Sequence, residues 1–134
     1  MILVDTNILL DVVTIDPHWA EWSQRQLETL ALQDRLVVNG VVYAELAPAF
    51  LRIEELDAAL AIAGVEIVEI PRAALYLAGR TFTDYRKRGG TKTGVLPDFF
   101  IGAHAVISAV PLLTRDTARY RSYFPTIELI APEA

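Results

Sequence analysis

Four acidic residues lie beside the most apolar segments of the chain. Asp5 directly follows the run ILV, and Glu45 lies within NGVVYAEL. Asp98 stands at the start of an apolar segment, just after Pro97, and Asp116 follows the run PLLT after one further residue. Burying unpaired carboxylates together is costly unless a cation or a proton compensates their charge. The four acids therefore predict a shared cation site.

Carboxylate oxygens are hard ligands, and they favour Mg²⁺ or Mn²⁺. Mg²⁺ is usually held by one or two carboxylates, so that water and a substrate phosphate complete its shell. Such an ion can polarise a phosphoryl oxygen, stabilise a leaving oxygen and lower the pKa of bound water. We therefore expect metal-assisted hydrolysis of a phosphodiester. The expected catalytic and metal-binding residues are Asp5, Glu45, Asp98 and Asp116.

Each acid, taken singly, also has a structural interpretation. Asp98 alone fits an acid at a helix N-terminus, where the interaction with the helix dipole is worth about 0.3–1 kcal/mol. Most Asp and Glu residues in proteins are surface residues or helix caps. Because all four acids accompany apolar segments, the combination favours the metal site.

Five short apolar runs predict buried strands, and the stretches between them have helical periodicity. The runs cover residues 2–4, 36–38, 65–68, 111–113 and 127–130. Alternation of short strands with helices is typical of a parallel sheet covered on both faces, so we expect the α/β class. Ligands of such sheets bind at the carboxyl ends of the strands. Asp5 and Asp116 would meet at that edge.

Helices are predicted over residues 18–33, 39–50, 54–63 and 72–88, and from Pro97 onward. Asp16 and Pro17 would begin the first of these, while Gly64 and Gly89 would end two others. Three glycines without apolar periodicity predict a loop over one end of the sheet from residue 89 to residue 96.

Composition favours a single domain over residues 1–134, because a chain of 134 residues with 53% hydrophobic side chains can bury one substantial core. No apolar run reaches the roughly twenty residues that cross a bilayer, and the start MILVD shows no secretory signal. With no cysteine, a reducing cytoplasm is a compatible location.

The net charge of -5 argues against phosphate binding by the whole surface but leaves an RNA substrate open.

Five motifs follow one another along the chain: VDTNILLDV, VVYAEL, LPDFFIGAHA, LLTRDTARY and FPTIELIAP. Together they resemble the PIN-domain family, in particular its VapC toxins, over nearly the whole chain. The resemblance implies a three-layer sandwich with a five-stranded parallel sheet, and Mg²⁺-dependent endoribonuclease activity in the cytoplasm. It also implies inhibition by a cognate VapB-type antitoxin, with a homodimer and a toxin–antitoxin hetero-oligomer as assemblies.

The resemblance also suggests roles for the four acids. Asp5 and Asp98 would be the principal metal ligands. Glu45 and Asp116 would complete the acidic pocket, binding through water or a second metal ion. Many relatives carry a serine or threonine near residue 39 or 40, which this chain lacks, so a hydroxyl contact there is not expected. All four acids are present, which is typical of an active member.

Several polar residues near these acids are further candidates. Asn7 and Thr114 would orient the metal ligands or position a phosphate, and Arg115 would contact RNA. A basic group on the longest predicted helix and its following loop has two interpretations, guidance of RNA or a solvated helix end. That group comprises Arg80, Arg86, Lys87, Arg88 and Lys92.

The histidines and tryptophans are less informative. His104 lies six residues beyond Asp98, which turns it away from that acid on a helix, so we expect a packed or capped residue. His18, at a helix start, is a weaker candidate still. Trp19 and Trp22 share one helical stripe and fit either core packing or an exposed groove for a partner.

Two other classes of function compete with the nuclease. The alternative is a noncatalytic binding module, which would use the same acidic pocket to bind a basic segment of a partner. Aspartate-nucleophile phosphatases and response-regulator receivers are disfavoured. The former carry a second acid two residues after the nucleophile, where this chain has Asn7, and the latter carry paired acids near the first strand. No phosphate-binding glycine-rich loop is present either.

Overall fold

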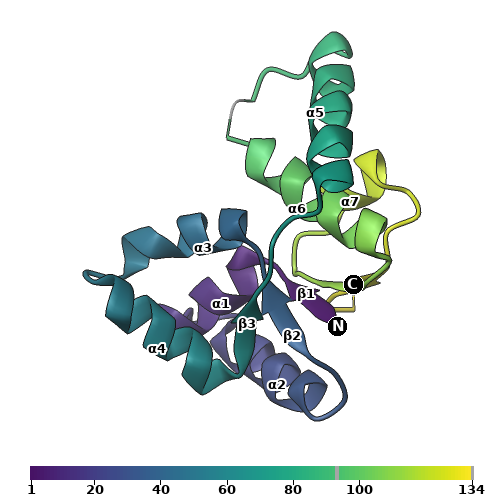
Figure 1. Ribbon diagram of the computed structural model, residues 1–134. Helices are drawn as coiled ribbons and strands as arrows, with labels where there is room; N and C mark the ends of the chain where they lie inside the picture. Colours follow the sequence, from purple (N-terminus) through teal and green to yellow (C-terminus); the bar gives the residue numbers. More distant parts are fainter. Residues whose placement is uncertain (93, 134) are drawn as a thin grey trace.

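A computed structural model describes residues 1–92 and 94–133, and in this part of the chain five strands form one parallel sheet (Figure 1). The strands are β1 (Ile2–Val4), β2 (Leu36–Val38), β3 (Val65–Ile67), β4 (Leu112–Leu113) and β5 (Leu129–Ile130). Their order in the sheet is β3-β2-β1-β4-β5. The expected strands are confirmed, although the last three are one or two residues shorter than expected.

Strand β1 occupies the centre of the sheet. Leu3 stands opposite Val37 of β2 on one side and opposite Leu112 of β4 on the other. All residues of β1, β2 and β4 are buried, as expected for continuous apolar runs in a parallel sheet. The residues that follow β1 and β4 therefore meet at one edge, where the backbone N–H of Asp5 donates to the carbonyl of Leu113 (2.9 Å).

Helices connect the strands and cover the sheet. Figure 1 shows α1 to α4 on one side of the sheet and α5 to α7 on the other, which confirms the α/β sandwich. Among the described residues, no helix combines the length and the apolar character needed to span a membrane. The helical segments are α1 (Thr6–Val13), α2 (Ala20–Ala31), α3 (Gly40–Leu46), the 3₁₀ turn η1 (Ala47–Ala49), α4 (Ile53–Ala63), α5 (Arg72–Lys87), α6 (Leu96–Ser108) and α7 (Ala118–Tyr123).

Some boundaries differ from the expected ones. Helix α2 begins at Ala20 rather than at residue 18, because Asp16 caps a preceding turn by accepting from the backbone N–H groups of His18 and Trp19 (2.9 Å each). Helices α1 and α7 were not foreseen as separate elements. Gly64 ends α4 in the left-handed conformation (φ 72°), as expected.

Helix α5 is the longest helix of the described residues and ends at Lys87, close to the expected stop. Gly89 follows with a positive φ of 89°, a conformation that favours glycine. The expected loop runs only to Val95, because Leu96 is already the first residue of α6. Residue 93 of this loop lies outside the described residues.

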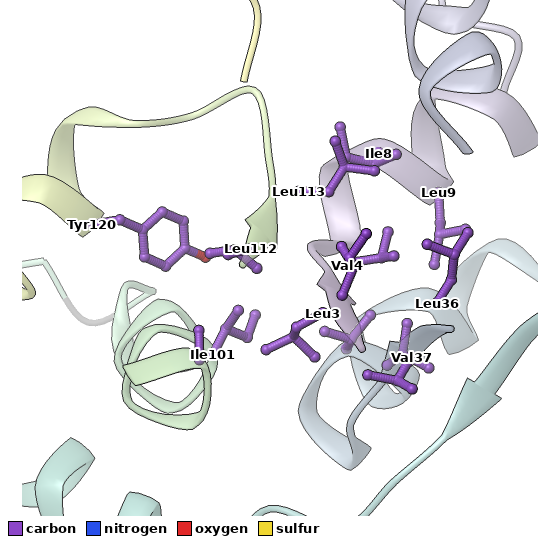
Figure 2. Close-up of a cluster of buried hydrophobic side chains, with 14 of the residues drawn as sticks. Leu3, Val4, Ile8, Leu9, Leu36, Val37, Ile101, Leu112, Leu113 and Tyr120 are labelled. Atoms are coloured by element: carbon purple, nitrogen blue, oxygen red, sulfur yellow. The ribbon is translucent and has the colours of Figure 1, made fainter. Parts of the chain in front are cut away.

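The buried side chains form one contiguous cluster, in agreement with a single core. Figure 2 shows its centre, where Leu3 and Val4 of β1 lie between side chains of α1, β2, β4 and α6. Tyr120 of α7 reaches into the same region and is 2% exposed. A second group of contacts joins α5, α6 and α7 through aromatic rings, with Phe99 at 5.5 Å from Tyr85 and 5.2 Å from Tyr123 between ring centroids.

Gly102 allows α7 to pack closely on α6. A Cβ atom at this position would lie 2.5 Å from the ring of Phe124 and 3.2 Å from the ring of Tyr120. Such distances are shorter than van der Waals contact. The small residue therefore sets the position of α7 and of the Tyr120 side chain.

We predict that Gly102→Ala destabilises the protein by about 1–3 kcal/mol, because the added methyl group overpacks the interface between α6 and α7. Gly79→Ala in α5 is the matched control, since a Cβ there meets no atom within 4 Å. The control should be neutral or gain up to about 1 kcal/mol from helix propensity. Urea unfolding of both variants measures the difference, and equal stabilities would contradict the packing argument.

Candidate active site

Asp5 directly follows β1 and caps α1. The residue is 4% exposed, and its Oδ1 accepts a hydrogen bond from the backbone N–H of Thr6 (2.7 Å). Its Oδ2 accepts from the hydroxyl groups of Thr114 (2.8 Å) and Tyr120 (2.9 Å), and from the side-chain amide of Asn7 (3.3 Å). Donors from distant parts of the chain thus converge on one buried carboxylate.

Burial raises the pKa of Asp5 to about 6, because the protein interior disfavours the charged form. The hydrogen bonds from Thr114 and Tyr120 lower this pKa, while the negative charge of Asp98 raises it. Asp5 is therefore ionised at neutral pH only against an energetic cost. A bound cation would reduce that cost.

Asp98 lies in the first turn of α6 and is paired with Arg119 of α7. The two side chains are 26% and 28% exposed. Burial raises the pKa of Asp98 and the charge of Asp116 acts in the same direction, while Arg119 and the hydroxyl of Tyr120 lower it. The net direction is upward because the effect of burial outweighs the lowering by Arg119.

Glu45 of α3 is connected to Asp5 through Thr6. The hydroxyl of Thr6 donates to Oε1 of Glu45 (2.6 Å), while the backbone N–H of the same residue donates to Asp5. Burial raises the pKa of the half-buried Glu45 carboxyl, and the charge of Asp98 raises it further, against the hydrogen bond from Thr6. Glu45 therefore belongs to the same electrostatic cluster as Asp5 and Asp98.

Asp116 is exposed and lies at the margin of this cluster. Its backbone N–H donates to the hydroxyl of Thr114 (3.1 Å), and its charge raises the pKa of Asp98. The residues that follow β1 and β4 therefore lie at the same edge of the sheet, as expected. The Asp116 side chain is nevertheless more exposed than those of the other three acids.

The cluster has the chemistry of a divalent cation site without a preformed cage. Within residues 1–92 and 94–133, no three acidic or histidine side chains converge closely enough to hold an ion by themselves. The charge of Asp98 nevertheless raises the pKa of both Asp5 and Glu45, and such a group fits Mg²⁺, which usually takes one or two carboxylates and completes its shell with water. The role of the four acids as metal ligands remains a prediction.

Asn7 and Thr114 orient the Asp5 carboxylate. The amide of Asn7 donates to the hydroxyl of Thr114 (3.2 Å) as well as to Asp5, and its Oδ1 accepts from the backbone N–H of Arg115 (3.3 Å). Thr114 is fully buried. This geometry suits the expected orienting role, whereas a contact of either residue with phosphate remains a prediction.

The Arg115 side chain is held by Asp11, an acid that the sequence analysis did not single out. Its Nε and Nη2 atoms each donate to the Asp11 carboxylate at 2.8 Å, and the hydroxyl of Ser23 donates to the same group (2.7 Å). The guanidinium also lies over the Trp19 ring, 5.5 Å from its centroid, and Trp19 meets Trp22 edge to face. The described contacts therefore give Arg115 a structural role, and its contact with RNA remains a prediction.

A model of the PIN domain matches residues 2–124. The chain belongs to the PIN domain family. No curated protein matches this PIN domain significantly in sequence.

Solved structures with the same fold are similar to this PIN domain over nearly its whole length. VapBC2 from Rickettsia felis, bound to a DNA fragment from its promoter, has 22% identity and a TM-score of 0.74, covering 99% of this chain and 100% of that chain. VapBC-1 from nontypeable Haemophilus influenzae has 20% identity and a TM-score of 0.71, covering 98% of each chain. DNA-bound VapBC from Salmonella typhimurium has 18% identity and a TM-score of 0.68, covering 97% and 96%. At these identities the similarity shows a common fold.

His104 is a packed residue of this PIN domain, as expected. It is 3% exposed, and its Nδ1 lies 3.1 Å from the side-chain amide nitrogen of the fully buried Asn39. Burial lowers the pKa of His104. The Oδ1 atom of Asn39 caps α3 by accepting from the backbone N–H groups of Val41 and Val42.

Sequence reasoning missed three residues of the site: Thr6, Arg119 and Tyr120. Thr6 joins Asp5 to Glu45, while Arg119 and Tyr120 contact Asp98 and Asp5. The only local signal was their position, since Thr6 follows Asp5 directly and the pair RY ends the motif LLTRDTARY. Position alone does not reveal which acid each side chain reaches.

We predict that Asp5→Asn gains about 1–2 kcal/mol of stability relative to the wild-type, metal-free PIN domain between pH 4 and pH 8. The folded-state pKa of Asp5 is raised to about 6 from 3.8, so the wild-type protein loses stability as the pH rises through this interval. The amide nitrogen of asparagine cannot accept the hydrogen bonds that Oδ2 of Asp5 accepts, but this loss is the same at both pH values and cancels from the difference. Urea unfolding in EDTA at both pH values measures this difference.

Asp16→Asn provides a control of opposite sign, because backbone hydrogen bonds from His18 and Trp19 lower the pKa of Asp16. That variant should show no gain in stability relative to the wild type between pH 4 and pH 8. The absence of a gain in Asp5→Asn as well would contradict the burial argument.

We further predict that Asp11→Asn destabilises the protein by about 2–4 kcal/mol, because it leaves Arg115 without its buried counter-charge. Asp34→Asn is the control. Asp34 also forms an ion pair, with the N-terminus, but its side chain is 45% exposed, so the loss should be clearly smaller than that in Asp11→Asn. Equal losses in the two variants, measured by urea unfolding, would argue against the structural role of the Asp11–Arg115 pair.

Proposed function

We propose that this PIN domain is a Mg²⁺-dependent endoribonuclease and the toxin of a toxin–antitoxin pair. The observation that supports the activity most directly is the cluster of Asp5, Glu45 and Asp98, whose carboxyl groups share a raised pKa. Such groups repel one another, and a divalent cation would stabilise them together. Mn²⁺ has the same ligand preference and is a second candidate.

The proposed mechanism assigns distinct tasks to the residues of the chain. When bound, Mg²⁺ would supply charge stabilisation for a phosphoryl oxygen and for the leaving oxygen. Asp5 and Asp98 would hold it, with Asp5 fixed in orientation by Thr114 and Tyr120. The hydroxyl of Thr6 donates to Oε1 of Glu45, so we propose that Oε2 accepts the proton of the attacking water. The raised pKa of Glu45 suits a base that works near neutral pH.

RNA is the proposed substrate, and basic residues on α5 would guide it. Helix α5 packs against α6, whose first turn carries Asp98. Positive charge beside an acidic pocket would offset the repulsion between the substrate and a chain of net charge -5. The basic residues proposed for this role are all exposed: Arg80, Arg86, Lys87, Arg88 and Lys92. We propose the cytoplasm as the location because RNA substrates are present there.

The proposed partner is a cognate VapB-type antitoxin, within a hetero-oligomer that contains a toxin homodimer. Several structures with the same fold come from toxin–antitoxin systems, including a toxin–antitoxin complex from Klebsiella pneumoniae. An apolar groove of about 520 Å³ lies between α1, α2, α3 and α4, lined by residues that include Leu9, Val13, Leu27, Leu60 and Ile62. It would accept the apolar face of a partner helix. Trp19 and Trp22 are not among its lining residues.

We predict that the purified protein cleaves RNA with Mg²⁺ or Mn²⁺ and loses this activity in EDTA. Asp5→Asn and Asp98→Asn should each lower the cleavage rate by about a hundredfold or more, because loss of a ligand exceeds the 10–100-fold effects of groups that merely support ligands. Glu21→Gln, an exposed acid of α2, is the control and should keep full activity. The assay follows gel-resolved cleavage of total and transfer RNA.

Full activity in Asp5→Asn or Asp98→Asn would exclude the proposed site. A protein that cleaves no RNA with either ion, yet binds a basic peptide through the same acids, would be a noncatalytic binding module.

The partner proposal has its own test. The protein should co-purify with the product of a short reading frame adjacent to its own, and Ile62→Asp in the groove should abolish this. Leu32→Asp is the matched control, because Ile62 and Leu32 are both 89% exposed but only Ile62 lines the groove. Equal retention of the partner by both variants would exclude the groove as its binding site.

A further inference from the structure

Two neighbouring residues of α7 contact two different acids of the cluster. Arg119 forms an ion pair with Asp98, and Tyr120 donates a hydrogen bond to Asp5 (2.9 Å). We infer that Arg119 is a built-in competitor of the divalent cation: its guanidinium occupies the Asp98 carboxylate in the metal-free protein and must leave before Asp98 can bind a metal ion. This inference rests on the metal site of the proposed function.

Competition follows from the atoms involved. Nη1 of Arg119 donates to Oδ2 of Asp98, and a carboxylate oxygen bound in this way has less capacity to coordinate an ion. The guanidinium also carries positive charge, which repels a second cation at the same place. Metal binding at Asp98 therefore requires the ion pair to open.

The anchoring of α7 allows this opening without a rearrangement of the fold. Tyr120 is 2% exposed and bound to Asp5, and Phe124 packs over Gly102 of α6. Both anchors follow Arg119 in the chain, and they hold the backbone of α7 against α6 next to that residue. Arg119, in contrast, has a side chain that is 28% exposed, and its long flexible stem can carry the guanidinium into solvent.

The charge balance gives the divalent ion the advantage in this exchange. Arg119 is paired with Asp98 alone, while the charge of Asp98 raises the pKa of both Asp5 and Glu45 and the charge of Asp116 raises that of Asp98, so the negative charge extends beyond the pair. A doubly charged ion compensates this surplus better than a single positive charge. Arg119 therefore weakens metal binding without preventing it.

A purely structural role for the pair, as a link between α6 and α7, makes a different prediction. In that case the loss of Arg119 would lower the stability of the fold and leave metal affinity unchanged or weakened. Competition predicts instead that the loss of Arg119 raises the metal affinity. Measurements of metal binding without RNA therefore separate the two roles.

The first experiment is calorimetric titration of the full chain with Mn²⁺ alone. Arg119→Gln should bind Mn²⁺ about five- to tenfold more tightly than the wild-type protein, because the competing ion pair is removed. Arg119→Lys keeps the positive charge and should stay closer to the wild-type affinity. Arg121→Gln, which removes an exposed arginine from the same helix, is the matched control and should change the affinity less than about twofold.

The second experiment observes the guanidinium directly. In ¹⁵N-detected NMR spectra of the metal-free protein, the Arg119 side-chain resonances should show the slow rotation of a paired guanidinium. These resonances are assigned to Arg119 because they should be absent from the spectrum of Arg119→Lys. Addition of Mg²⁺ should produce the rapid averaging of a solvated side chain, while the Arg121 resonances remain unchanged.

The outcomes separate this inference from the proposed function. Unchanged or weaker Mn²⁺ binding in Arg119→Gln, with normal binding by the wild-type protein, would overturn the competition and leave the metal site in place. Arg119 resonances that stay paired at saturating Mg²⁺ would overturn it as well. A wild-type protein that binds neither ion would overturn both the competition and the nuclease proposal.

Discussion

A carboxylate at the end of a buried central strand must find hydrogen-bond donors or a cation within the protein. Asp5 stands in this position because the strand before it is apolar and enclosed by neighbours on both sides. Its donors, Thr6, Thr114 and Tyr120, come from the helix that follows, from the end of β4 and from α7. Hydrogen bonds to the Asp5 carboxylate therefore help to hold the last third of the chain against the first strand.

The two most buried acids of the described residues illustrate two solutions to the same problem. Asp11 is 2% exposed and has a full counter-charge in Arg115, together with the hydroxyl of Ser23. Asp5 is 4% exposed and has neutral donors only, while the neighbouring charge that shifts its pKa is the negative charge of Asp98. The charge of Asp11 is thus balanced within the fold, whereas that of Asp5 is not. This difference distinguishes an acid that supports the fold from one suited to bind an ion.

The sheet and the four acids could be predicted from the sequence because their signals are local. The run before Asp5 and the run before Asp116 are apolar and short, and a parallel sheet brings their ends to one edge. The partners of the acids could not be predicted in this way. Arg115 looked like an RNA contact, but the acid that holds it lies 104 residues away in the sequence. Helix α7 has only six residues, too few for a clear periodic signal.

The hydrogen bond between Asp5 and Tyr120 spans 115 residues of the chain, and the bond between Asp5 and Thr114 spans 109. Contacts of such long range form only after the intervening chain has been made and folded. During synthesis the first strand leaves the ribosome early, yet its carboxylate lacks these donors until the last helix has emerged. The acidic cluster is therefore completed only when α7 packs against the first strand.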